Sequence, residues 1–65
     1  MITVNGEGMS LDRPVTVYVW LEDRGLNPDL VAVEHNGTLL TRVQFREAVV
    51  KDGDMLEVVR FVGGG

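Results

Sequence analysis

The chain has no cysteine, one histidine and one serine among its 65 residues. Without cysteine it can form neither a disulfide nor a thiolate zinc site. Ser10 and His35 are the only serine and histidine, and no spacing around them supports a Ser–His–acid triad. We therefore expect no metal site, no bound cofactor and no catalytic activity of the chain's own.

Long apolar runs and an excess of basic residues are also missing. No stretch approaches the ~20 apolar residues of a membrane span, and strand-like sequence begins at Met1 instead of a secretory leader. Six basic against ten acidic residues give a net charge of −4, which disfavours nucleic acid and anionic lipid as partners. We expect a single small cytoplasmic domain. Its acidic residues either form a solvated surface or steer it toward a basic patch on a protein partner.

What the sequence does have is an ending of three glycines, Gly63 to Gly65, directly after the apolar run 58–62. A terminal glycine can be an unselected end. Alternatively, a tail without side chains can thread a narrow channel and present its carboxylate to a partner. The sequence thus predicts a folded domain over residues 1–62 and a flexible tail over 63–65. A free carboxylate is a poor electrophile, and linking it to AMP from ATP would make it reactive. A sulfur nucleophile could then displace AMP and leave a thiocarboxylate.

Alternating apolar residues and turn signals predict several strands. Asn5-Gly6 and Asn36-Gly37 are typical of two-residue hairpin turns, in which both residues have positive φ. We expect a loop at 27–29 and a short turn of helix around 44–46. Strands are predicted at residues 1–5, 9–11, 30–35, 38–40 and 55–61.

The segment from Pro14 to Arg24 is ambiguous. Its alternating valines and its aromatic residues favour a strand slightly. Thr16 is nevertheless a possible N-cap, Gly25 a possible helix end, and Val17, Trp20 and Leu21 share a helical stripe. Local sequence alone leaves both structures open.

Three acidic residues, Asp52, Asp54 and Glu57, lie close together before and within the predicted last strand. Their spacing lacks the twelve-residue loop of an EF-hand. We therefore expect a solvated turn here and no metal.

The order of these features resembles that of the ThiS family, the small sulfur carriers of thiamin biosynthesis. The most specific matches are Asp52-Gly53-Asp54 ahead of the last strand and the ending from Phe61 to Gly65. The resemblance covers the whole chain and implies the α+β, ubiquitin-like β-grasp fold. In that fold a mixed sheet of four to five strands packs on one main helix, here at about residues 16–24. The predicted core then consists of Val17, Trp20 and Leu21 of the helix and Ile2, Val4, Val31, Val33, Leu56 and Val58 of the sheet. Val59 and Phe61 lie on the open sheet face.

The resemblance also implies a mechanism and its partners. An E1-like adenylyltransferase of the ThiF type would activate the chain, using ATP and Mg²⁺. A cysteine desulfurase would supply sulfur, and a thiazole synthase of the ThiG type would accept it. The reacting group would be the carboxylate of Gly65. The partner-contacting residues would be Gly64, Gly63, Val62, Phe61 and Val59.

Three other interpretations remain open. The chain could be a carrier like the small subunit of molybdopterin synthase or a carrier for another sulfur-containing metabolite. It could also be a protein modifier joined to lysines through Gly65, or an interaction module whose glycines do nothing.

Overall fold

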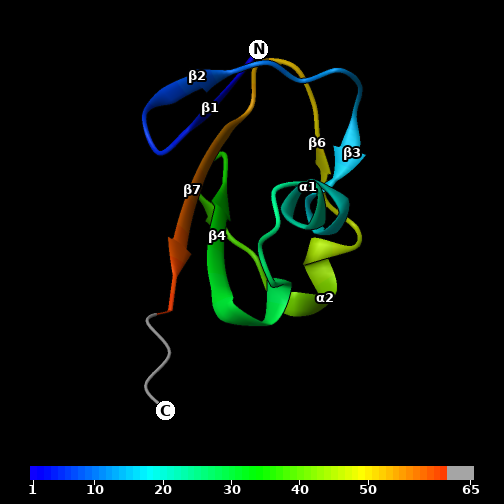
Figure 1. Cartoon of the computed structure of the whole chain (residues 1–65), viewed down its shortest axis with the longest axis vertical. Helices are drawn as coiled ribbons and strands as arrows, with labels where there is room; N and C mark the ends of the chain where they lie inside the picture. Colours follow the sequence, from blue (N-terminus) through cyan, green and yellow to red (C-terminus); the bar gives the residue numbers. More distant parts are fainter. Residues whose placement is uncertain (62–65) are drawn as a thin grey trace.

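A mixed five-stranded sheet forms one side of the molecule (Figure 1). The computed structural model describes residues 1–61. The strand order is β2-β1-β7-β4-β5, so the first and last strands lie side by side near the centre. β1 runs parallel to β7, and the other pairs of this sheet are antiparallel. The strands are β1 (Ile2–Val4), β2 (Glu7–Met9), β4 (Val31–His35), β5 (Thr38–Leu39) and β7 (Met55–Arg60).

One main helix, α1 (Val17–Asp23), contributes buried residues to the core that it shares with the sheet. It begins at Thr16, whose side-chain hydroxyl accepts a hydrogen bond from the backbone N–H of Val19 at 3.2 Å. It ends at Arg24, and Gly25 follows with a φ of 73°. The resemblance predicted a main helix at about 16–24, and the structure confirms it.

The slight local preference for a strand in this segment is wrong for residues 17–23. It holds only for β3 (Val15–Thr16), which pairs with β6 (Val49–Val50) in a small separate sheet. The side chains of Val17 and Leu21 are fully buried. Burying such a side chain contributes about 1.5–3 kcal/mol, which outweighs a helix propensity penalty of up to ~0.7 kcal/mol per residue. The packing of these side chains therefore determines that residues 17–23 form a helix.

Both Asn-Gly pairs form the expected hairpin turns. Asn5 and Asn36 each have a φ of 50°, and the glycines that follow them also have positive φ. The second strand of the first hairpin begins earlier in the sequence than predicted. β2 starts at Glu7, directly after the two-residue turn, instead of at residue 9. A two-residue loop leaves no room for the intervening segment that we expected before residue 9.

Two short helical elements connect the strands on the side away from β1. Most of the segment 27–29, predicted as a loop, forms a single 3₁₀ turn, η1 (Pro28–Leu30), which is capped by the side chain of Asn27. The expected turn of helix near residue 45 is α2 (Arg42–Phe45). It begins at Thr41, which forms a capping box with Gln44.

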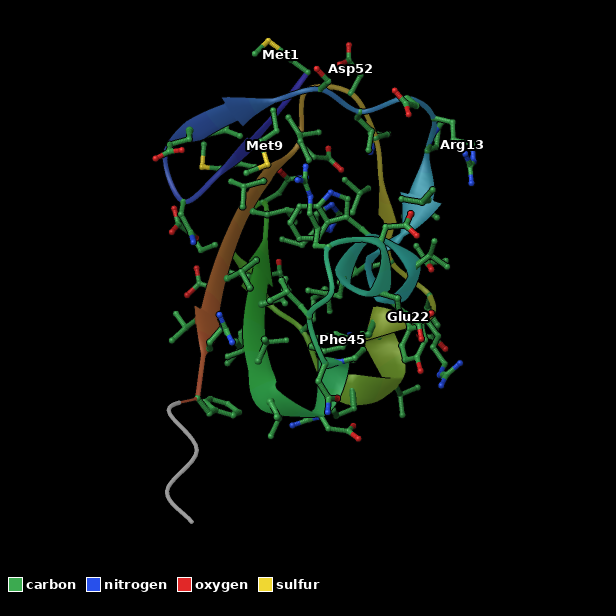
Figure 2. The ribbon with its side chains drawn as sticks, in the orientation of Figure 1. Met1, Met9, Arg13, Glu22, Phe45 and Asp52 are labelled. Atoms are coloured by element: carbon green, nitrogen blue, oxygen red, sulfur yellow. The ribbon has the colours of Figure 1, made fainter. Side chains whose placement is uncertain are left out.

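The hydrophobic core lies between the sheet and these helices (Figure 2). The predicted core residues are buried, except that Val58 is half-buried. Phe45 and Val50 also belong to the core and were not predicted. Among residues 1–61, no helix is long and apolar enough to cross a membrane. The buried hydrophobic residues are Ile2, Val4, Val17, Trp20, Leu21, Val31, Val33, Phe45, Val50 and Leu56.

Candidate functional site: the end of the last strand

β7 leads to the candidate site, the glycine ending. In Figure 1 it runs from the β1–β2 hairpin to the opposite end of the molecule. Phe61 is the last residue that the structure describes. Four of the predicted site residues, Val62, Gly63, Gly64 and Gly65, lie outside the described residues, as does the predicted tail at 63–65.

The two other predicted site residues lie exposed on the outer face of the sheet. The relative exposure of Val59 is 60% and that of Phe61 is 51%. Side chains alternate along a strand, so both project from the face opposite Leu56, which is fully buried in the core. Met55, 54% exposed, lies on the same face at the start of β7. The structure thus places an apolar pair on the outer face, at the end of the described part of the chain.

Pairing with β4 holds β7 along its whole length. The register runs from His35 opposite Leu56 to Val31 opposite Arg60. One step further, the backbone N–H of Phe61 donates to the carbonyl oxygen of Leu30 at 2.8 Å. The backbone is therefore fixed up to the last described residue.

On its other edge, the backbone of β7 is hydrogen-bonded to the side chain of Asn5, at a place where the neighbouring strand has already ended. The backbone N–H of Val58 donates to Oδ1 of Asn5 at 2.7 Å, and Nδ2 of Asn5 donates to the carbonyl oxygen of Val58 at 3.1 Å. β1 itself reaches only as far as the pair Val4–Leu56. The amide of Asn5 thus satisfies two backbone groups beyond the end of β1.

A buried carboxylate fixes the start of β7. Asp54, only 5% exposed, lies 2.7 Å from Nε2 of His35, and it accepts from Nδ2 of Asn36 at 3.2 Å and from the backbone N–H of Lys51 at 3.0 Å. Burial by itself raises the pKa of Asp54. The hydrogen bonds from His35, Lys51 and Asn36, aided by the nearby Lys51 charge, outweigh it and lower the pKa to about 2. Asp54 is therefore a structural anion.

The expectation of a solvated turn is wrong for Asp54. Asp52 agrees with it, since its side chain is 82% exposed and pairs with the N-terminal amine (Figure 2). The two acids look alike in the sequence. They differ because the neighbouring β4–β5 turn contacts Asp54 through Asn36. The side chain of Asn36 also accepts from the backbone N–H of Met55 at 2.8 Å. The Asn36-Gly37 signal could have located this turn but not its contact with Asp54.

Two hollows elsewhere on the described chain take no residue from β7. One, of about 190 Å³, lies near Arg13 and Trp20, and the other, of about 470 Å³, lies between α1, η1 and α2. No three His, Cys, Asp or Glu side chains of residues 1–61 gather closely enough to hold a metal ion. Within the described part of the chain, the candidate site is thus a strand end rather than a small-molecule pocket.

Comparison with known proteins agrees with this arrangement. The family model described as "ThiS family" matches residues 2–65, which includes the glycine ending. The chain belongs to the ThiS family. The resemblance seen in the sequence is therefore confirmed over almost the whole chain.

Individual ThiS-related proteins show the same likeness. The sulfur carrier protein ThiS of Bacillus subtilis strain 168 is 30% identical over 66 residues, which cover all of both proteins. The crystal structure of the thiamine biosynthesis protein ThiS of Geobacter metallireducens superposes with a TM-score of 0.83 at 37% identity, covering 98% of this chain and 97% of that one. This agreement confirms the ubiquitin-like β-grasp fold.

A second kind of relative is much longer. The thiazole synthase of Paramagnetospirillum magneticum is 36% identical over 64 residues, which are 98% of this chain but 20% of that protein. The ThiS-family chain thus spans about a fifth of the length of this relative.

Proposed function

We propose that this ThiS-family chain is a sulfur carrier for the thiazole of thiamin, acted on by enzymes rather than acting as one. The observation that carries the proposal is the family match, which runs through residue 65 and so includes the glycine ending. β7 supports it, because a backbone paired up to Phe61 delivers the next four residues from a fixed point. Four extended residues reach at most ~14 Å.

The chemistry would take place at the carboxylate of Gly65. An E1-like adenylyltransferase of the ThiF type joins this carboxylate to AMP, consuming ATP with Mg²⁺ and releasing pyrophosphate. The terminal sulfur of a persulfide, formed by a cysteine desulfurase, attacks the carbonyl carbon and AMP leaves with the bonding electrons. A thiol then reduces the resulting acyl disulfide. It takes the outer sulfur into a new disulfide and leaves a thiocarboxylate on the chain.

The folded domain would provide the surface that these enzymes recognise. The side chains of Val59 and Phe61 are apolar and exposed, and apolar residues of this kind anchor protein interfaces. In the sequence they directly precede the tail. Val62 would contact the partner next to them, and Gly63 and Gly64 would pass through its channel, where a side chain has no room.

A thiazole synthase of the ThiG type is the proposed acceptor of the sulfur. Support comes from the relatives in which a segment similar to this whole chain is part of a protein named thiazole synthase. The same matches favour the thiamin route over a molybdopterin-type carrier or a protein modifier.

Pyrophosphate exchange tests the first step. With a ThiF-type enzyme, ATP and Mg²⁺, the chain should support exchange of labelled pyrophosphate into ATP. A variant lacking Gly65 should support none, and Gly65→Ala should slow the exchange by crowding the channel. Unfolding of residues 1–61 should be the same in all three proteins. Equal exchange with and without Gly65 contradicts the proposal.

A further inference from the structure

Successive residues of β7 direct their backbone N–H and C=O groups to opposite edges of the strand. Phe61 donates its backbone N–H to Leu30, and Met55 accepts from the backbone of Asn36. In an antiparallel pair only alternate residues direct their backbone groups at the partner strand. The odd-numbered residues of β7 therefore bond toward β4, and Leu56, Val58 and Arg60 direct their N–H and C=O groups to the opposite edge.

On that opposite edge, the neighbouring chain stops before Arg60. The carbonyl oxygen of Leu56 accepts from the backbone N–H of Asn5, and both backbone groups of Val58 bond to the Asn5 side chain. Gly6 then turns the chain away into β2. Figure 1 shows β7 running on past this hairpin turn, with β4 on its other side. Among residues 1–61, no strand lies beside Arg60 on this edge.

An exposed strand edge with unpaired N–H and C=O groups is a template for another strand. A segment added here would lie about 4.8 Å from β7. On the outer face its side chains would flank Val59 and Phe61, which are 60% and 51% exposed. Its alternate residues would lie beside the side chain of Arg60. The edge thus fits an extended segment with apolar residues on one face and an acidic residue on the other.

We propose that the open edge of β7 at Arg60 receives an extended segment of the adenylating enzyme as an added β-strand. This inference rests on the proposed function. The enzyme is the occupant that the edge favours, because the same backbone continues from Arg60 over five residues to the carboxylate at Gly65. Pairing at Arg60 holds the start of that tail along the enzyme's own backbone, next to the apolar pair. A second copy of this chain has no such relation to the carboxylate.

Two variants of Arg60 separate its backbone from its side chain. Arg60→Pro removes the backbone N–H that faces the open edge and leaves the bonds to β4 intact, and proline is tolerated on such edges. Arg60→Ala keeps the N–H and removes only the charged side chain. We expect Arg60→Pro to bind the adenylating enzyme about tenfold more weakly than Arg60→Ala, the effect of one lost hydrogen bond. Equal affinities, measured by calorimetry, overturn the proposal.

Hydrogen exchange of the wild-type chain gives an answer that does not depend on any variant folding. Read by NMR, the amide of Arg60 should exchange rapidly in the uncomplexed chain and slowly in the complex, whereas those of Val59 and Phe61 are slow in both. Rapid exchange at Arg60 in the complex overturns the proposal. So does protection in the chain alone that grows with concentration, which indicates pairing between two copies.

The failure of this inference differs from the failure of the proposed function. If wild-type chain is adenylated while Arg60 stays unprotected, only the added strand is wrong. If no ThiF-type enzyme binds or adenylates the wild-type chain, the proposed function is wrong, and the inference fails with it.

Discussion

Asp54→Asn removes the charge of the buried carboxylate that fixes the start of β7 and keeps its shape. The pKa of Asp54 falls from 3.8 to about 2 in the folded chain. At about 1.4 kcal/mol per pKa unit, this difference corresponds to about 2 kcal/mol of folding free energy at neutral pH. Asp54→Asn should therefore lower the free energy of unfolding at pH 7 by about 2 kcal/mol, measured by urea denaturation.

The effect should depend on pH with a definite sign. A carboxyl group whose pKa is lowered by folding stabilises the native state above its unfolded pKa, and this contribution disappears as the pH falls through the folded pKa. The groups that face Asp54 are His35, Asn36 and Lys51. The difference between wild type and Asp54→Asn should be full above pH 5 and shrink steadily between about pH 4 and pH 2.

Asp52→Asn is the matched control, two residues away in the same turn. The Asp52 side chain is 82% exposed and pairs only with the N-terminal amine among the described contacts. Exposed pairs contribute about 0–1 kcal/mol. If Asp54→Asn costs no more than Asp52→Asn at pH 7, or costs as much at pH 2 as at pH 7, the anchoring role of Asp54 is refuted.

Three further predictions concern the N-cap of α1, the side chain of Asn5 and the outer face of β7. Thr16→Ala should lower unfolding free energy by about 1 kcal/mol in thermal denaturation, through loss of the helix N-cap; an unchanged midpoint contradicts this. Asn5→Gly keeps the turn, since glycine accepts its φ of 50°, but should accelerate hydrogen exchange at Val58; unchanged exchange contradicts the clamp. Val59→Lys should weaken binding to the adenylating enzyme at least about tenfold in calorimetry, whereas Met55→Lys, at the far end of the same face, should not. Equal losses contradict the assigned docking position.

Much of the fold could be predicted because its signals are local. The two Asn-Gly pairs locate both hairpins, since few other residues accept positive φ at two successive positions. The alternating apolar residues of β4 and β7 identify the core strands. The small sheet of β3 and β6 was missed, because two-residue strands leave no periodic pattern.

The rest depends on contacts between distant parts of the chain. Local sequence could not decide α1, because burial of Val17 and Leu21 overrides its weak helix propensity. Asp54 looked solvated because the residues that surround it, His35 and Asn36, come from another hairpin. The sequence did place Val59 and Phe61 correctly on the outer face. The four site residues from Val62 onward stay predictions.

The central claim is that the carboxylate of Gly65 carries sulfur, and the mass of the intact chain tests it most directly. The chain is incubated with a ThiF-type enzyme, ATP, Mg²⁺, a cysteine desulfurase, cysteine and a reducing thiol. We expect the mass to increase by the difference between one sulfur and one oxygen, with the change located in the terminal residue by fragmentation. An unchanged mass after adenylation has been demonstrated, or sulfur located elsewhere in the chain, contradicts the account.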